Sequence, residues 1–188
     1  MTEKNTPLPP GGLVPPLATP GEFAGKVALV TGGTDGLGEH LCRTLVSFGA
    51  EVFFCGRRAE LGRRRQAEWG ERAHFVPCDL ADVEAARALV RQTGELRGHL
   101  DYLVNNAAID PDRPFEDISA EEFDRVVAID LRSQFVVTQA AVGYLRKGAG
   151  KAIVNVCTTN YLHGWCGATA YNAAKAGIVG FSRSLARE

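Results

Sequence analysis

A glycine-rich turn between a short apolar run and an amphipathic stretch constrains the fold of this chain more than any other feature. Residues 26–31 (KVALVT) are rich in β-branched side chains, which is typical of a buried strand. Residues 37–48 carry apolar side chains at helical spacing, so a helix is expected to begin where the turn ends. A strand, a tight turn and a helix in this order form the first half of a βαβ unit.

Three glycines of that turn stand where a bound phosphate would need room. Gly32, Gly36 and Gly38 have no Cβ, so the backbone can approach a ligand closely at these positions. The N–H groups at the N-terminus of the following helix attract anions. Because the turn lies between a strand and a helix, it predicts a pyrophosphate-binding site of the kind that dinucleotides occupy.

Strands and helices alternate along the rest of the chain. The strands are expected at residues 26–31, 51–55, 74–77, 100–105 and 151–156. The helices are expected at residues 37–48, in the arginine-rich stretch after residue 55, from 82 to about 96, from 120 to about 147 and from about 169 to the end. This alternation predicts an α/β fold, with a parallel sheet that helices cover on both faces.

The first residues differ in composition from the rest. Six of the nine prolines fall within residues 1–20, which denies this segment regular backbone hydrogen bonding. The segment also lacks the charged start and the continuous apolar stretch of a secretory signal. We therefore expect a flexible Pro-rich tail at residues 1–22 and a single domain at residues 23–188.

Composition and charge argue against several function classes. A net charge of −1 gives no bulk attraction to nucleic acid or to an anionic membrane, and no apolar run approaches the ~20 residues that span a bilayer. The five cysteines are scattered and are never spaced as C-x-x-C, and the four histidines form no ligand pattern. The sequence thus predicts a cytoplasmic protein with reduced thiols, without a bound metal and without a nucleic-acid or membrane partner.

A tyrosine and a lysine lie four residues apart on the last expected helix. Tyr171 and Lys175 share one helical face, at about 6 Å between their Cβ atoms. A tyrosine pKa of about 10 is too high for acid–base work at neutral pH, and a nearby cation lowers it. We expect Lys175 to lower the pKa of Tyr171, so that the phenol exchanges a proton with a carbonyl or alcohol oxygen.

The glycine spacing and the tyrosine–lysine pair together resemble one family. Residues 31–38 fit the pattern T-G-x-x-x-G-x-G, which is similar to that of the short-chain dehydrogenase/reductase (SDR) family, and the resemblance covers residues 26–188. It implies a Rossmann fold with a doubly wound parallel sheet. It also implies hydride transfer between NAD(P)(H) and a small-molecule carbonyl/alcohol substrate, by a homo-oligomer (dimer or tetramer).

The resemblance implies a set of cofactor-binding residues. In the family the residue that ends the second strand selects the dinucleotide, and here Gly56 stands at that position with Arg57 beside it. A guanidinium in place of an acid favours binding of the 2′-phosphate of NADP. Asp35, an acid inside the glycine turn, argues against NADP. The alternative for Arg57 is a position on a solvated helix face. NADP is therefore the preferred cofactor, with NAD left open. The expected cofactor-binding residues are Gly32, Thr34, Asp35, Gly36, Leu37, Gly38, Arg57, Asp79, Leu80, Asn106, Ala107, Tyr171 and Lys175.

Two further residues complete the catalytic set that the resemblance implies, which is Tyr171, Lys175, Thr158 and Asp130. Thr158 stands where the family places its catalytic serine, and its hydroxyl can hold and polarise the substrate oxygen. Asp130 stands where the family usually has asparagine, and its charge opposes that of Lys175 and tends to raise the pKa of Tyr171. We expect an active site that works but turns over slowly at neutral pH.

The length of the chain departs from the family pattern. Family members usually continue past the tyrosine helix with two more strands, so the last strands of the sheet are expected to be missing from these 188 residues. The strand at residues 151–156 would then be an uncovered edge, and the chain by itself would be marginally stable and poorly active. The alternative function is a non-catalytic nucleotide-binding or oligomerisation protein, truncated or degenerate through changes such as Asp130 and Thr158.

Overall fold

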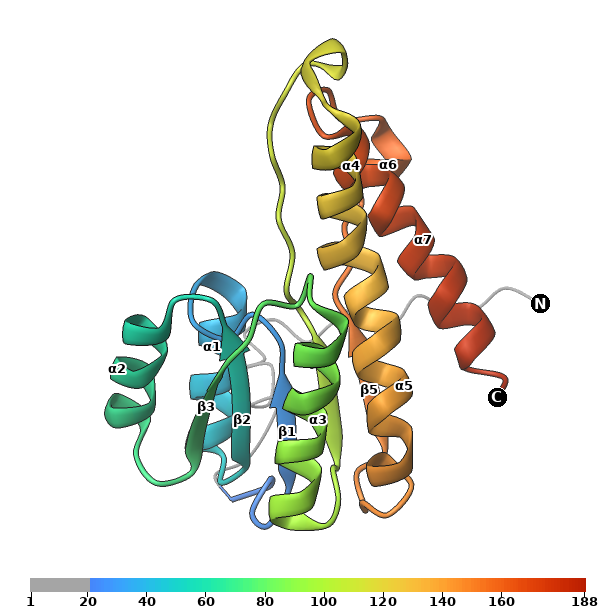
Figure 1. The fold of residues 1–188 in the computed structure, drawn as a ribbon. Helices are drawn as coiled ribbons and strands as arrows, with labels where there is room; N and C mark the ends of the chain where they lie inside the picture. Colours follow the sequence, from blue (N-terminus) through green and yellow to red (C-terminus); the bar gives the residue numbers. More distant parts are fainter. Residues whose placement is uncertain (1–20) are drawn as a thin grey trace, which may run out of the picture.

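Five parallel strands form the sheet at the centre of the structure, a computed structural model that describes residues 21–188 (Figure 1). Their order is β3-β2-β1-β4-β5, so the chain first builds outward on one side of β1 and then crosses to the other side. Ligands of open α/β sheets bind at this reversal, between β1 and β4. The strands are β1 (Val27–Val30), β2 (Glu51–Gly56), β3 (Ala73–Pro77), β4 (Tyr102–Asn105) and β5 (Ala152–Asn155).

Helices alternate with these strands, as the sequence predicts. Asp82 and Ser119 begin α3 and α4 as N-caps, because their side chains accept hydrogen bonds from N–H groups of the first turn. The helix expected at residues 120–147 differs in one respect, since a π-helical segment, η2, separates α4 from α5. The helical segments are α1 (Gly36–Ser47), α2 (Ala59–Trp69), α3 (Val83–Arg97), η1 (Phe115–Asp117), α4 (Ala120–Val127), η2 (Ala128–Arg132), α5 (Ser133–Leu145), α6 (Asn160–His163) and α7 (Thr169–Leu185).

Helices cover both faces of the sheet, as a doubly wound fold requires (Figure 1). On one face α3 and α5 pack on the strands, and Leu89 and Val137 join Leu29 of β1 in one apolar cluster. On the other face α1 packs on the sheet, with Cys42 in a second cluster beside Val30. The strands near the centre are therefore buried on both sides, and the expected α/β class is confirmed.

The strand β5 is buried less well than its neighbours. Val154 is 52% exposed, whereas Leu103 of the adjacent strand β4 is fully buried. β5 pairs with β4 along one side and forms an edge of the sheet that the described residues make. The uncovered edge that the sequence predicts is present at this strand.

The expected tail, residues 1–22, lies outside the described residues except for its last two, so the division into tail and domain stays a prediction. Ordered packing is evident from Phe23 onward, because its backbone N–H donates to the carbonyl of Phe48 at 3.1 Å. Within residues 21–188, no helix has the length and apolar character to cross a membrane. The same residues contain no group of three or more His, Cys, Asp or Glu side chains arranged to hold a metal ion.

Candidate active site

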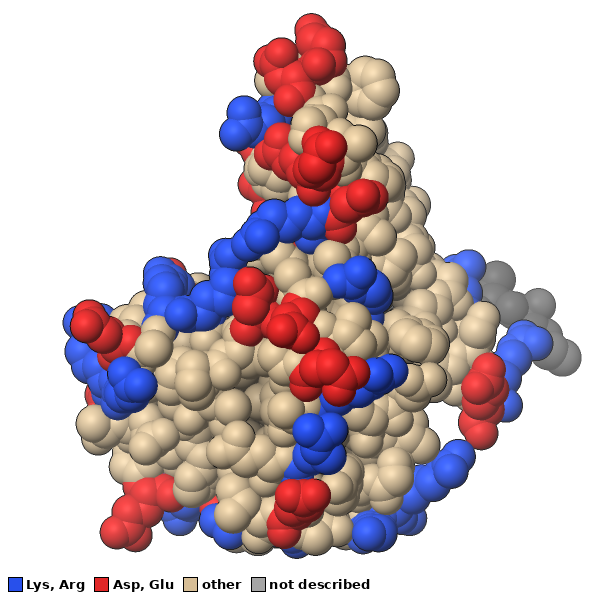
Figure 2. Space-filling model, viewed as in Figure 1, with Lys and Arg blue, Asp and Glu red and all other residues tan. Residues whose placement is uncertain are grey.

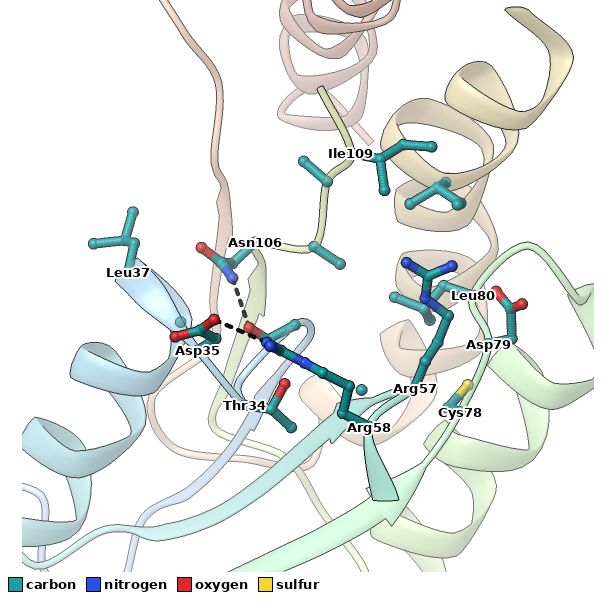
Figure 3. Close-up of a pocket in the computed structure, with 16 residues that line it drawn as sticks. Thr34, Asp35, Leu37, Arg57, Arg58, Cys78, Asp79, Leu80, Asn106 and Ile109 are labelled. Carbon is teal, nitrogen blue, oxygen red and sulfur yellow. Dashed lines mark hydrogen bonds and ion pairs between the residues drawn. The ribbon is translucent and has the colours of Figure 1, made fainter. Parts of the chain in front are cut away.

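A cavity of about 380 Å³ opens at the carboxyl ends of the strands, where the order of the sheet reverses (Figure 3). Its walls come from the turn after β1, the end of β2 and the segments that follow β3 and β4. Its lining residues are Gly32, Thr34, Asp35, Leu37, Gly38, Gly56, Arg57, Arg58, Cys78, Asp79, Leu80, Asn106, Ala107, Ala108, Ile109 and Ile129. Its position and size suit one end of a dinucleotide.

Ten of the expected cofactor-binding residues line this cavity. Gly36 is not part of its wall, and Tyr171 and Lys175 belong to helix α7 instead. The residues that sequence reasoning did not assign are Gly56, Arg58, Cys78, Ala108, Ile109 and Ile129. Most of them are next to an assigned residue in the sequence, and this adjacency could have identified them. Ile129 comes from the π-helical segment, where it adjoins Asp130 of the expected catalytic set, and only Ile109 has no assigned residue next to it.

The glycines of the turn act partly through packing and not only through access for a ligand. A Cβ on Gly38 would collide with the Gly32 carbonyl and would lie 2.5 Å from Nδ2 of Asn106. A Cβ on Gly32 would lie 2.8 Å from Cα of Ala107. Only at Gly36, where φ is +56°, would a Cβ point into open space. The turn therefore needs two of these glycines to fit against the chain after β4, which corrects the single role expected for all three.

The N-terminus of α1 faces the cavity with its first-turn N–H groups. Asp35 caps this helix by accepting from the Gly36 N–H at 2.9 Å. Leu37 and Gly38 belong to the same first turn, where backbone N–H groups have no partner four residues earlier in the helix. A pyrophosphate fits this cradle, because the N–H groups and the helix dipole both favour an anion.

Arginines stand on the β2 side of the cavity, where the 2′ end of the adenosine ribose would lie (Figure 3). Arg57 extends along the wall toward Leu80 and Asp79. Arg58 instead bonds to Asp35 across the cavity mouth, with Nη2 3.0 Å from Oδ2. The Arg58 guanidinium holds the pKa of Asp35 below its usual value. Asp35 stays ionised in an exposed ion pair with Arg58, so its role as a counterweight to NADP stays a prediction.

Asn106, directly after β4, fastens the floor of the cavity. Nδ2 of Asn106 donates to the carbonyls of Thr31 and Gly32 at 3.0 and 3.2 Å. The Thr31 hydroxyl accepts from the backbone N–H groups of Asn106 and Ala107 at 3.0 and 3.1 Å. These bonds join the end of β4 to the glycine turn and leave few polar groups free to rearrange.

Tyr171, Lys175 and Thr158 come together at the start of α7. The Thr158 hydroxyl acts on the Tyr171 phenol and lowers its pKa. Nζ of Lys175 lies 5.4 Å from the centre of the Tyr171 ring and donates to the Val156 carbonyl at 3.1 Å. Lys175 is 1% exposed, so its charge is held in the interior beside the tyrosine.

The expected direction of the Tyr171 pKa is wrong. Burial raises the pKa of Tyr171 above its usual value, and the charges of Asp110 and Asp130 raise it further. Burial also lowers the pKa of Lys175, which weakens the cation that was expected to dominate. Only the expected effect of Asp130, whose charge raises the pKa of Tyr171, has the same direction in the structure. Asp110 was missed, although it follows the Asn-Asn-Ala-Ala segment by two residues.

Asp130 is wholly buried within the π-helical segment η2. Its Oδ1 accepts from the Ile109 N–H at 2.9 Å, whereas its Oδ2 has no hydrogen-bond partner among the described residues. Burial raises the pKa of Asp130 to about 7, although Ile109 and Lys175 both act in the opposite direction. A carboxyl group that titrates near neutrality thus stands behind the tyrosine–lysine pair.

Acidic side chains gather on the end of the molecule above this site. Figure 2 shows them over η1 and α4, which carry Glu116, Asp117, Glu121 and Glu122. Val126 of α4 packs on α7, so this acidic end adjoins the helix that carries Tyr171. The charges that raise the pKa of Tyr171 nevertheless belong to Asp110 and Asp130 and not to these exposed residues.

Comparison with known proteins identifies the family to which this chain belongs. A family profile described as short chain dehydrogenase matches residues 26–188. The chain is 37% identical to an acetoacetyl-CoA reductase of Acinetobacter sp. (strain RA3849), over 87% of this chain and 68% of that protein. It is also 37% identical to a cyclopentanol dehydrogenase of Comamonas testosteroni, over 88% of this chain and 68% of that protein.

A solved structure with a similar fold is the 3-ketoacyl-(acyl-carrier-protein) reductase from Brucella melitensis, complexed with NADH. Its TM-score is 0.81 and its sequence identity 30%, over 87% of this chain and 69% of that chain. The chain belongs to the short chain dehydrogenase family and spans about two thirds of the length of these relatives. The expected Rossmann fold and the class of NAD(P)-dependent oxidoreductase are confirmed, and the relatives do not support the non-catalytic alternative.

Proposed function

We propose that Tyr171 is the acid–base group with which this protein interconverts a small-molecule carbonyl compound and its alcohol. The observation that carries the proposal is the buried Lys175, whose Nζ lies 5.4 Å from the centre of the Tyr171 ring, with the Thr158 hydroxyl acting on the same phenol. A phenol needs both a partner for the substrate oxygen and a nearby cation to exchange its proton efficiently. These three groups adjoin the cavity whose glycine turn suits a pyrophosphate, because Ile109 lines that cavity and packs against the same apolar cluster as Tyr171.

Each residue then has a separate task. The Thr158 hydroxyl holds the substrate oxygen next to the Tyr171 phenol, which donates its proton during reduction and regains it during oxidation. Lys175, which the Val156 carbonyl orients, stabilises the phenolate and binds the nicotinamide ribose. When bound, the dinucleotide supplies or accepts the hydride. Asp130 holds the Ile109 segment in place through its hydrogen bond to the backbone.

Replacing the phenol tests this assignment directly. Tyr171→Phe keeps the ring and removes only the hydroxyl, so kcat for a panel of ketones and alcohols should fall by about 10²–10⁴-fold. Dinucleotide affinity, measured by the fluorescence of the reduced nicotinamide, should change little. Tyr144→Phe in α5 is the matched control and should keep wild-type turnover. A Tyr171→Phe variant that retains more than a tenth of the wild-type kcat would contradict the proposal.

We propose NADP as the preferred dinucleotide. Gly56 supports this choice. A Cβ at this position would lie 2.8 Å from Cγ2 of Thr34, so there is no room for the acidic side chain that would select NAD. Arg57 lines the same wall with an extended guanidinium. Arg57→Ala should weaken NADPH binding by about tenfold or more and leave NADH binding almost unchanged, since a charged hydrogen bond contributes about 1.5–3 kcal/mol. Arg63→Ala, on the exposed side of α2, is the control.

We also propose that the protein is a homo-oligomer, a dimer or tetramer, in the cytoplasm. The five cysteines are free, which suits a reducing compartment. Phe135 of α5 is 48% exposed and meets Phe181 of α7, and such an exposed apolar pair supports contact between subunits. Light scattering of the purified chain tests the oligomeric state, and a monomer at all concentrations would contradict it.

A further inference from the structure

An ion pair joins two walls of the dinucleotide cavity. Asp35 lies in the turn that precedes α1, and Arg58 lies between β2 and α2. Nη2 of Arg58 is 3.0 Å from Oδ2 of Asp35, and both residues line the cavity (Figure 3). The two walls are close together here, since a Cβ on Gly56 would lie 2.8 Å from Cγ2 of Thr34. The pair therefore stands beside the end of β2, where dinucleotide-binding folds hold the 2′ position of the adenosine ribose.

The Asp35 carboxylate occupies two groups that a phosphate would otherwise bind. Its Oδ1 accepts from the Gly36 N–H at 2.9 Å, at the N-terminus of α1. Its Oδ2 accepts from the Arg58 guanidinium. The N–H groups at a helix N-terminus and the guanidinium of an arginine are both common ligands of phosphate oxygens in proteins. Asp35 is therefore an internal competitor for any phosphate that approaches Arg58.

The pair is open to solvent, so a ligand can replace one partner. The Arg58 and Asp35 side chains are 57% and 61% exposed. Exposed ion pairs are weak, and such a pair holds its partners together by a factor of about five or less. A phosphate carries more charge than a carboxylate and accepts two parallel hydrogen bonds from a guanidinium. A phosphate at this point therefore competes successfully with Asp35, whereas an uncharged hydroxyl does not.

We propose that Arg58 is a second binding residue for the 2′-phosphate of NADP and that Asp35 competes with the phosphate for it. The inference rests on the proposed preference for NADP. With NADP bound, the Arg58 guanidinium turns from Asp35 to the 2′-phosphate, beside Arg57, while Asp35 remains the cap of α1. With NAD bound, the 2′ group is an uncharged hydroxyl and the ion pair remains closed. Asp35 thus reduces the preference for NADP that the two arginines create.

Two adenosine nucleotides that differ in the 2′-phosphate alone test the proposal. Titration calorimetry of the purified chain gives the Kd of adenosine 5′-monophosphate and that of adenosine 2′,5′-bisphosphate. The first Kd divided by the second measures recognition of the 2′-phosphate. Asp35→Asn keeps a capping oxygen but loses the charge, so this ratio should rise about fourfold. Asp82→Asn, at the equivalent cap of α3 and outside the cavity wall, is the matched control and should leave the ratio unchanged.

A double-mutant cycle separates competition from independent effects. Arg58→Ala should lower the ratio about fivefold in the wild-type chain and about twentyfold in Asp35→Asn, because a charged hydrogen bond then forms without a competitor. Equal losses in the two backgrounds would overturn the competition, and no loss in either would overturn the role of Arg58. A ratio near one in the wild type that rises in Asp35→Asn would contradict the NADP preference but support the competition. A ratio near one in both chains would contradict the preference and this inference together.

Discussion

The glycine turn and the catalytic residues around Tyr171 lie near the same edge of the sheet. The polar groups of the turn have hydrogen-bond partners, whereas a buried polar atom of the catalytic region has none among the described residues. At the turn, the Asn106 amide bonds to two carbonyls and the Thr31 hydroxyl accepts two N–H groups. At the other region, Asp130 and Lys175 are buried, and Oδ2 of Asp130 has no partner among the described residues. An orphaned polar atom is costly in an interior and is retained mainly where chemistry needs it.

The binding region and the catalytic region therefore depend on different kinds of interaction. The binding region is defined by backbone contacts that hardly depend on pH, and it depends on small side chains that permit close approach. The catalytic region depends on buried charges, because burial raises the pKa of Asp130 to about 7 and lowers the pKa of Lys175. The variants below test whether each region fails in the manner that its construction predicts.

The largest effect is expected in the catalytic region, from loss of the buried cation. Lys175→Met removes the charge beside Tyr171 and should lower kcat/KM by about 10³-fold, because general acid–base catalysis contributes about 10²–10⁴-fold. Dinucleotide affinity should fall by less than about tenfold, since a single charged hydrogen bond is lost. Steady-state kinetics and fluorescence titration separate the two effects. Lys147→Met, at the exposed end of α5, should be without effect, and a loss confined to KM would contradict this prediction.

A collision in the binding region should come next. Gly38→Ala places a Cβ against the Gly32 carbonyl and the Asn106 amide. The turn must shift, so NADPH affinity should fall by about 100-fold and the free energy of unfolding by about 1–3 kcal/mol. Gly143→Ala is the matched control, because nothing lies within 4 Å of its Cβ and alanine should stabilise α5 by about 0.5–1 kcal/mol. Unchanged NADPH affinity in Gly38→Ala would remove the case for close packing of the turn.

Asp101 is a buried carboxylate whose two oxygens both accept hydrogen bonds, in contrast to Asp130. Burial alone would raise the pKa of Asp101, but the N–H groups of Val27, Gly150 and Ala149 outweigh it and hold that pKa below its usual value. Asp101→Asn should therefore lower the free energy of unfolding by about 1–3 kcal/mol at pH 7.

The pH dependence of this loss has a defined sign. A lowered folded-state pKa means that the Asp101 contribution is present above the unfolded pKa of about 4 and disappears as pH falls through the folded value. Chemical denaturation at pH 7 and pH 3 should thus show a smaller difference between wild type and variant at pH 3. Asp124→Asn, exposed on α4, should cost less than about 0.5 kcal/mol at either pH. A deficit as large at pH 3 as at pH 7 would refute the charge-based explanation.

The smallest effect on the kinetics is expected at the unsatisfied carboxyl of Asp130. Asp130→Asn removes a charge that raises the pKa of Tyr171, so the acid limb of the pH profile for alcohol oxidation should move to lower pH, by about one unit or less. Because the folded-state pKa of Asp130 is raised to about 7, its unfavourable effect on stability should grow as pH rises from about 4 to about 7.

The stability of the Asp130→Asn variant should lack that dependence on pH. Thermal melts at pH 5 and pH 8 measure it beside the kinetic profile. A profile that coincides with that of the wild type would show that Asp130 does not act on the tyrosine.

The fold followed from the sequence because local signals agree with it. The run that became β1 is apolar over its whole length and β4 has Leu103 and Val104 at its centre, and Asp82 and Ser119 cap the helices that they precede. Most cavity residues could be assigned as well, because the glycine turn and the Asn-Asn-Ala-Ala segment are contiguous in the chain.

The electrostatics of the catalytic region could not be predicted in the same way. The pKa of Tyr171 depends on its burial and on Asp110, which reaches it from the segment after β4. The spacing between Tyr171 and Lys175 reports the cation alone and not the groups that oppose it. Ile129 and the π-helical segment that carries it have no separate sequence signal, since the apolar pattern around them suits an ordinary α-helix.

The π-helical segment has a consequence for how this protein can vary. A wider turn holds one more residue than an α-helical turn, so α4 and α5 are out of phase by about 100° relative to a regular helix. Deleting any residue between 128 and 132 would restore a regular helix and rotate Asp130 away from Ile109, or rotate α5 away from the sheet. We therefore expect these five residues to tolerate substitutions better than a deletion of one residue, which would separate Asp130 from the Ile109 backbone that it holds.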